Sequence, residues 1–297
     1  MSSFVIETPK EFSFHQCLHF LNRSPHELLH VTQGEKVEKI ILVNGETILF
    51  SITTNVHSNL IVTVLNGRIT SAIQKAVSGY VEEWFDLKND LRPFYKMASK
   101  DALLRPLVKK YSGYRIVSMP DLFESLSWAI IGQQINLTFA YRLKQQFVAA
   151  FGTKFLWNGQ IYYHFPLPQV VAELAPAALL ALQFSRQKAE YVITVARAFT
   201  SGLISKEKLS KLSFDEAKQS LLQLKGIGNW TANYALMKTF HYPNAFPMED
   251  AGLHQAVRKH LKLDQKPTLQ EVEKLFKKYK GWEAYATLYL WRSLGED

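Results

Sequence analysis

The chain has 297 residues, of which 47% are hydrophobic and 21% charged, a composition typical of folded globular proteins. Its 35 Lys and Arg residues outnumber its 26 Asp and Glu residues, and the net charge of +9 favours a polyanionic partner, nucleic acid before a membrane surface. A basic protein that binds no nucleic acid can have the same net charge, so charge alone does not establish nucleic-acid binding. The single cysteine, Cys17, excludes an internal disulfide and a four-cysteine zinc or iron–sulfur site.

Targeting and metal-binding patterns are absent from the sequence. The first residues lack the basic start and apolar core of a signal peptide, and no apolar run approaches the roughly 20 residues that cross a bilayer. The nine histidines are scattered, without a ligand spacing such as H-E-x-x-H. We therefore expect a soluble, cytoplasmic protein that is not a transition-metal enzyme.

The N-terminal third alternates between strand and helix patterns. Residues 37–65 are rich in Val, Ile and Thr and contain a turn signal at Asn44-Gly45, which predicts two strands joined by a hairpin. Asn66-Gly67 marks a second turn, and residues 70–85 return to a helical period. Residues 1–115 are therefore predicted to form an α+β domain.

From Pro120 onward the apolar residues recur at helical spacing almost without a break. The residues from Ser213 to Glu216 form a capping box that begins one helix, and Gly152 and Gly202 end two others. Residues 116–297 are therefore predicted to form an all-α domain. Its helices are expected near residues 121–131, 135–150, 168–174, 176–182, 186–201, 214–223, 229–240, 251–261, 269–279 and 282–293.

Residues 221–254 contain a tight turn between two of these helices. One helix is expected to end at Leu224, and the next begins at Asn229. Gly226 and Gly228 can take positive φ and leave the backbone amides uncovered, so that the turn and the helix N-terminus form a site for one phosphate oxygen. An ordinary helix–helix turn has the same pattern when it is seen alone.

An aspartate follows this hairpin at a defined distance. Asp250 comes 22 residues after Gly228 (250 − 228), at the end of the segment Phe-Pro-Met-Glu-Asp and at the start of a predicted helix. Aspartate is also a preferred N-cap, and the capping and catalytic roles are compatible. The adjacent Glu249 is the alternative candidate for the catalytic carboxylate. Because adjacent side chains at a helix start point in different directions, only one of the two can face the site.

The hairpin, the proline-containing loop and this aspartate together resemble the fingerprint of the helix-hairpin-helix DNA glycosylase superfamily. Residues 224–234, LKGIGNWTANY, resemble the bacterial 3-methyladenine DNA glycosylase II family within it. Residues 83–94, 128–135 and 285–291 resemble further segments of that family in the same order. The resemblance covers residues 80–297, and residues 1–80 are only generally similar to the family's α+β N-terminal domain.

This resemblance implies an enzyme that flips an alkylated base out of duplex DNA, with Asp250 as the catalytic carboxylate. Cleavage of the bond between base and sugar builds positive charge at the anomeric carbon, which a carboxylate stabilises while it orients the attacking water. Relatives that also cut the DNA backbone have a lysine where this chain has Trp230. Hydrolysis that leaves an abasic site is therefore expected. The alternatives are a bifunctional glycosylase/lyase for oxidised bases and a non-catalytic helix-hairpin-helix module, against which Asp250 argues because DNA phosphates repel a carboxylate.

The resemblance also implies a base pocket formed by Trp230, Tyr234 and Trp291. An alkylated purine is electron-poor, so an indole face can stack on it with a cation–π contribution. A role in the hydrophobic core is the alternative for all three residues. Duplex DNA with alkylated bases is the expected partner, and neither a cofactor nor a protein partner is expected.

Three further roles follow from the resemblance. Gln134 is at the position of the residue that fills the gap left by the flipped base in the family. The alternative is that Gln134 is an exposed loop residue without this role. In the phosphate-binding hairpin, Lys225 would supply a charge and Thr231 a hydroxyl beside the two glycines. The main-chain carbonyls of Leu222, Leu224 and Ile227 would hold a monovalent cation.

Overall fold

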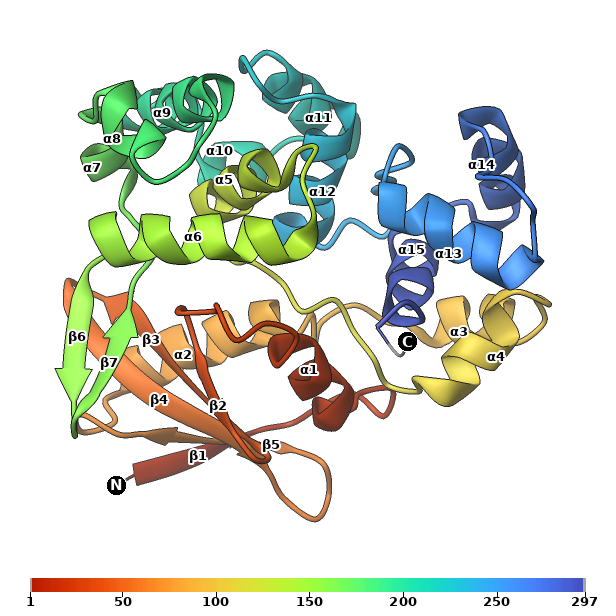
Figure 1. Cartoon of the computed structure of the whole chain (residues 1–297). Helices are drawn as coiled ribbons and strands as arrows, with labels where there is room; N and C mark the ends of the chain where they lie inside the picture. Colours follow the sequence, from red (N-terminus) through yellow and green to blue (C-terminus); the bar gives the residue numbers. More distant parts are fainter. Residues whose placement is uncertain (1, 296–297) are drawn as a thin grey trace.

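In the computed structural model, which describes residues 2–295, the chain begins with a five-stranded antiparallel sheet (Figure 1). Its spatial order is β1 (Ser2–Ile6), β5 (Leu60–Val64), β4 (Glu46–Thr54), β3 (Lys36–Val43) and β2 (Val31–Gln33). β3 and β4 are joined by a two-residue turn in which Asn44 has φ 52° and Gly45 has φ 84°, the left-handed conformation that such hairpins require. The hairpin predicted there is confirmed.

Helices α1 (Phe14–Leu21) and α2 (Ser71–Trp84) complete this α+β unit, and α2 lies across the sheet (Figure 1). The Thr70 side chain caps α2, whose buried residues are Val77, Val81 and Trp84. The remaining helices are α3 (Arg92–Ala98), α4 (Leu104–Lys110), α5 (Leu122–Gly132), α6 (Leu137–Phe151), α7 (Pro168–Ala172), α8 (Pro176–Leu180), α9 (Arg186–Thr200), α10 (Lys206–Leu209), α11 (Phe214–Leu222), α12 (Asn229–Phe240), α13 (Ala251–Leu261), α14 (Leu269–Phe276), the 3₁₀ turn η1 (Lys277–Tyr279) and α15 (Glu283–Arg292).

The helical region agrees with the sequence prediction except at two places, the short helix α10, which was not predicted, and a β-hairpin. The capping box at Ser213 and Glu216 is present, and each predicted helix has a counterpart. A hairpin of β6 (Lys154–Trp157) and β7 (Gln160–Tyr163), however, interrupts the part predicted to be entirely helical. Asn158 and Gly159 form its turn with positive φ, and the Tyr162 hydroxyl donates to Glu38 on β3. The hairpin therefore attaches the helical region to the first sheet.

A separate lobe lies on the far side of α12 (Figure 1). There α15 packs against both α4 and α13, so a helix from the first third of the chain joins helices from its end. Arg115 fixes this arrangement, because its fully buried guanidinium donates to the carbonyls of Glu11, Asp86 and Asn89. The carboxylate of Asp86 in turn accepts from Tyr285 on α15. No helix among residues 2–295 is both long and apolar enough to cross a membrane.

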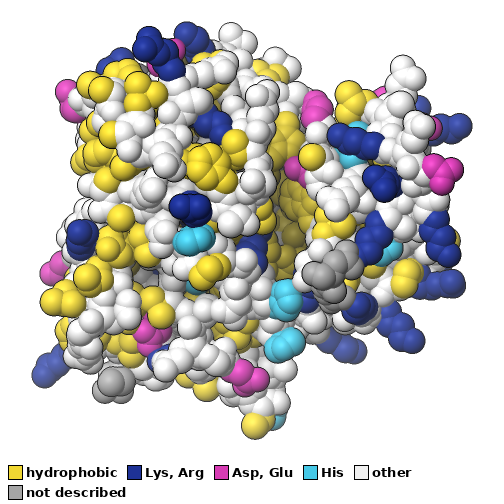
Figure 2. Space-filling model, viewed as in Figure 1, with side chains coloured by type: hydrophobic (Ala, Val, Ile, Leu, Met, Phe, Trp, Pro, Cys, Tyr) yellow, Lys and Arg dark blue, Asp and Glu magenta, His cyan; other side chains and the backbone are white. Residues whose placement is uncertain are grey.

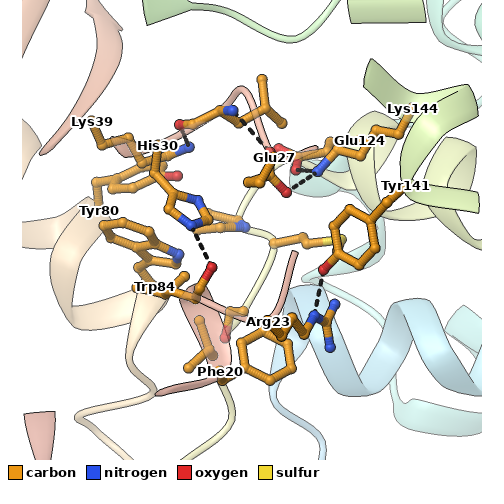
Figure 3. A pocket seen from close by; sticks show the side chains of 16 residues that line it. Phe20, Arg23, Glu27, His30, Lys39, Tyr80, Trp84, Glu124, Tyr141 and Lys144 are labelled. Atoms are coloured by element: carbon orange, nitrogen blue, oxygen red, sulfur yellow. Dashed lines mark hydrogen bonds and ion pairs between the residues drawn. The ribbon is translucent and has the colours of Figure 1, made fainter. Parts of the chain in front are cut away.

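A small cavity lies between the N-terminal unit and the helical region and is lined by side chains from both (Figure 3). The ammonium of Lys144 on α6 lies there between Glu27, at 3.0 Å, and Glu124 on α5, at 3.4 Å. Burial is the largest single influence on the pKa of Glu27 and raises it, but the charge of Lys144 and the further charges and hydrogen bonds around the carboxylate together lower this pKa to about 2. Burial lowers the pKa of His30 to about 4, so this imidazole is neutral at physiological pH.

Lys144→Met should destabilise the protein by about 3 kcal/mol, because it leaves two buried carboxylates without their cation. Thermal unfolding of the variant measures this loss, with the exposed Lys154→Met as the control. Adding Glu27→Gln should recover part of the stability. Equal unfolding temperatures for the Lys144 and Lys154 variants would contradict the role of the buried cluster.

Candidate active site

The turn between α11 and α12 contains Gly226 and Gly228, and its backbone conformation requires glycine only at Gly226. Gly226 has φ +95°, and a Cβ there would lie 2.3 Å from Cγ of Tyr191 on α9. Gly228 has φ −91°, so the expectation of positive φ at both glycines is wrong for this residue. Its importance lies elsewhere: it caps α12, it is exposed, and a Cβ would meet nothing within 4 Å. The turn therefore presents its backbone to solvent, beside the exposed Lys225.

Thr231 does not face the phosphate side of this turn. Its side chain is 1% exposed, and its hydroxyl accepts a hydrogen bond from Gln133 Nε2 at 3.2 Å. The same Nε2 donates to the carbonyl of Gly226 at 3.1 Å. The hydroxyl therefore helps to attach the hairpin to the end of α5, and its burial argues against the phosphate contact expected of it.

Three hydrogen bonds fix the half-buried carboxylate of Asp250. Trp230 Nε1 on α12 donates to Oδ2 at 3.0 Å, and Trp291 Nε1 on α15 donates to Oδ1 at 2.7 Å. Oδ1 also accepts from the backbone N–H of Leu253 at 2.8 Å, so the side chain caps α13 as well. Both oxygens are thus oriented by donors from three helices.

The neighbouring carboxylate points elsewhere. Glu249 is exposed and accepts from Asn229 Nδ2 at 2.5 Å, at the N-terminal end of α12. Asn233, one turn further along α12, accepts from the backbone N–H of Phe246 at 3.1 Å and so fixes the loop that precedes Asp250. Of the two adjacent carboxylates, only that of Asp250 contacts the two indoles.

The three predicted pocket residues lie together. The rings of Trp230 and Tyr234 stack at 5.3 Å, and those of Tyr234 and Trp291 are 6.4 Å apart. Both tryptophans are partly exposed, whereas Tyr234 is 7% exposed and accepts from Trp128 Nε1 at 3.0 Å. Figure 2 shows a deep groove with a hydrophobic lining between the body that contains α12 and the lobe that contains α13 and α15. The two tryptophans belong to helices on opposite sides of this groove, and the ring of Tyr234 packs against both of them.

Gln134 lies in the connection between α5 and α6. It is exposed and has φ 56°, a left-handed conformation that is uncommon outside glycine. The preceding Gln133 is anchored to the hairpin, and the following turn begins α6, which Asn136 caps. The tight turn therefore holds Gln134 outward, on the connection that is attached to the hairpin.

Sequence reasoning missed several residues that build this site. Gln133 and Asn233 connect the hairpin to its surroundings, although amide side chains give no signal of that kind in a sequence. Gly252 is the third: a Cβ there would lie 3.1 Å from Asp250 Oδ1 and 3.5 Å from Cδ1 of Trp291. A glycine at the second position of a helix is unusual by propensity, and that signal was available. Among residues 2–295, no group of three or more His, Cys, Asp or Glu side chains is arranged to hold a metal ion.

Comparison with known proteins places the chain among DNA repair enzymes. The family model described as HhH-GPD superfamily base excision DNA repair protein matches residues 127–281, and the 8-oxoguanine DNA glycosylase N-terminal domain matches residues 6–126. A DNA-3-methyladenine glycosylase from Bacillus subtilis is 40% identical over 98% of this chain and 96% of its own length. The DNA-3-methyladenine glycosylase 2 of Escherichia coli is 28% identical over 62% of this chain and 61% of its own length.

Solved structures share the fold over nearly the whole chain. The 3-methyladenine DNA-glycosylase from Archaeoglobus fulgidus has a TM-score of 0.82 at 23% identity and covers 98% of this chain and 97% of its own. The 8-oxoguanine glycosylase/lyase of Clostridium acetobutylicum has a TM-score of 0.73 at 19% identity, with 98% and 96% covered. The predicted fold class is confirmed by these matches.

Gly252→Ala should slow base release by roughly 10-fold, because a methyl group would displace Asp250 Oδ1 from the Trp291 donor and a displaced charge stabiliser costs about 1–2 kcal/mol at the transition state. Single-turnover rates on methylated duplex measure the effect. Alanine is a better helix former, so the unfolding temperature should not fall with the rate. The matched control is Gly79→Ala on α2, where an added Cβ would meet nothing within 4 Å. Gly281→Ala is unsuitable because the φ of Gly281 is +84°. A rate equal to that of Gly79→Ala would show that the close contact does not matter.

Proposed function

The chain belongs to the HhH-GPD superfamily of base excision DNA repair proteins, and we propose that it hydrolyses alkylated bases of the 3-methyladenine type out of duplex DNA without cutting the strand. DNA glycosylase activity follows from the family itself. The observation that carries the finer proposal is the Asp250 carboxylate, oriented by the indoles of Trp230 and Trp291 at the groove. A cytoplasmic location and independence of a protein partner belong to the same proposal.

The reaction would begin with a base that is rotated out of the helix, because its sugar bond is inaccessible inside the duplex. The exposed faces of Trp230 and Trp291 offer a stacking surface for an electron-poor ring, and cationic bases gain most from it. Gln134, held outward on its tight turn, is the proposed occupant of the gap in the duplex. Its amide can form hydrogen bonds with the base left without a partner.

Asp250 would act as the bond to the base weakens. Its negative charge would face the anomeric carbon as that carbon becomes positive, and its fixed donors would avoid a reorganisation cost at the transition state. Water attacks the sugar carbon, the base leaves with the bond electrons, and the carboxylate accepts the proton of the water. The products are the free base and an abasic site.

The hairpin of Lys225, Gly226 and Gly228 would bind a backbone phosphate through its exposed amides and the N-terminal end of α12. Leu222 ends α11, where carbonyls lack partners within the helix, and the carbonyl of Leu224 accepts from the N–H of Ile227 at 3.0 Å. The carbonyls of Leu222, Leu224 and Ile227 are the proposed ligands of a monovalent cation, which would supply a further positive charge to the phosphate.

Neither of the lysines that flank Trp230 in the sequence, Lys225 and Lys238, is suited to attack the sugar as an amine. Trp230 occupies the relevant place in the hairpin, and Lys225 lies on the solvent side of the turn. Lys238, on the same helix as Trp230, is 2% exposed, and its ammonium donates to the carbonyl of Val117. Burial lowers the pKa of Lys238 well below its ordinary value, yet this amine is directed into the protein core.

Asp250→Asn should lower the rate of 3-methyladenine release by roughly 10²-fold or more while duplex affinity is retained, because one preorganised charge is lost. Asparagine also caps helices, so the unfolding temperature should change little. Base release from methylated duplex under single-turnover conditions is the measurement, with Glu249→Gln as the matched control. A native rate for Asp250→Asn would refute the assignment.

Borohydride added during the reaction should trap no covalent complex between protein and DNA, because hydrolysis forms no Schiff base. Alkali after the reaction should cut the strand at the lesion, which identifies the abasic product. A strong borohydride-dependent adduct with the unmodified protein would instead place the enzyme among the bifunctional glycosylase/lyases.

A further inference from the structure

The positive charge of the chain is concentrated in two segments. Residues 92–110 and 251–280 together contain 14 Lys and Arg residues but only four Asp and Glu residues, a net charge of +10. The whole chain has a net charge of +9, so the other residues together have a net charge of −1. An excess confined to a sixth of the sequence calls for a local explanation.

These segments meet in one part of the fold. They form α3, α4, α13, α14 and η1, the lobe beside the groove, which we call the basic lobe. All 14 side chains are exposed, and in Figure 2 Lys and Arg side chains are spread over the lobe on the face that contains the groove. They are Arg92, Lys96, Lys100, Arg105, Lys109, Lys110, Arg258, Lys259, Lys262, Lys266, Lys274, Lys277, Lys278 and Lys280.

Local structural roles account for only some of these charges. Arg92 pairs with Asp90 and Lys278 with Asp101, each at 2.6 Å. Arg258 and Lys259 are in the last turn of α13, where cations interact favourably with the helix dipole. Neither effect explains why two segments far apart in sequence place a common excess of lysine on one lobe.

Helix α13 relates this lobe to the reaction site. It begins directly after Asp250 and has 11 residues, so its far end lies about 16 Å from the carboxylate along the helix axis. Successive base pairs are about 3.4 Å apart, so Arg258 and Lys262 are at the distance of phosphates roughly five base pairs from the flipped nucleotide. The hairpin of α11 and α12 lies on the other side of the groove (Figure 1), where it would contact a different part of the DNA backbone.

We propose that the basic lobe is a second DNA-binding surface that holds the duplex flanking the lesion on one side. This inference rests on the proposed function and extends it from the flipped base to the length of duplex bound. Each lysine or arginine near a phosphate releases counterions, so the lobe adds affinity that is independent of sequence and sensitive to salt. Duplex DNA is favoured over an anionic membrane because the lobe adjoins the groove that binds the base.

The test compares a double variant with a charge-matched control. Arg258→Gln with Lys262→Asn removes two charges from the lobe, and asparagine suits Lys262 because its φ is 52°. Lys75→Gln with Lys154→Gln removes two exposed charges from α2 and β6, which belong to the sheet side of the molecule (Figure 1).

The DNA probes contain a stable abasic-site analogue in a short duplex of about 10 base pairs, or in the same duplex extended by about 8 base pairs on one side or on the other. We expect one extension to tighten binding by the unmodified protein about 10-fold, and the lobe variant to lose that gain. The salt dependence of binding, as log Kd against log salt, should become less steep by about 2. The control should keep both the gain and the slope.

Four outcomes would overturn the proposal: an unchanged gain in the lobe variant, an equal loss in the control, an equal loss on the unextended duplex, or loss of binding to phosphatidylserine vesicles with duplex affinity unchanged. Base release from a short methylated duplex is measured in parallel. If the unmodified protein releases base while the lobe variant binds extended duplex normally, only the basic lobe is refuted. If the unmodified protein releases no base, the proposed function itself fails.

Discussion

The geometry of the site depends on the hydrogen bonds that the Asp250 carboxylate accepts from the indoles of Trp230 and Trp291. A carboxylate in an apolar groove is costly unless both oxygens have donors, and here the donors belong to helices on opposite sides of the groove. The same side chain caps α13, so its backbone position is fixed as well. One charged group therefore aligns α12, α13 and α15, and each of these helices also supplies part of the proposed stacking or catalytic surface.

This arrangement extends from the carboxylate into the N-terminal unit. Trp230 stacks on Tyr234, whose hydroxyl accepts from Trp128, and Trp128 packs at 4.8 Å against Tyr141 on α6. The hydroxyl of Tyr141 accepts from Arg23, just beyond α1. Because each ring is held by the next, the orientation of the indole at the groove depends on packing that begins in another part of the chain. The α+β unit in this way supports the orientation of Trp230 through Arg23.

The sequence predicted the helices and the hairpin well because their signals are local. Capping residues, glycines and apolar spacing near Ser213 and Gly226 act within a few residues, and the structure follows them. The β6–β7 hairpin was missed because its four-residue strands are held by contacts with β3, distant in sequence, although Asn158-Gly159 was a readable turn signal. The environment of Thr231 was misjudged for the same reason, since its burial depends on Gln133 from another helix. The boundary near residue 115 stays a prediction, although α4 packs against α15 and thus contacts the end of the chain.

A catalytic carboxylate creates an electrostatic difficulty for an enzyme whose substrate is a polyanion. A phosphate about 10 Å from Asp250 repels it by about 0.4 kcal/mol at the dielectric constant of water, and by more where the groove excludes water. The indole donors reduce the cost of burying the carboxylate, but its negative charge still repels the DNA phosphates. Positive charge on both sides of the groove would offset this repulsion. In the proposed complex the hairpin amides would act close to the flipped nucleotide, and the basic lobe, with a net charge of +10, would act over the flanking duplex. The groove itself can then remain apolar enough to discriminate between bases, because affinity for the backbone is supplied outside it.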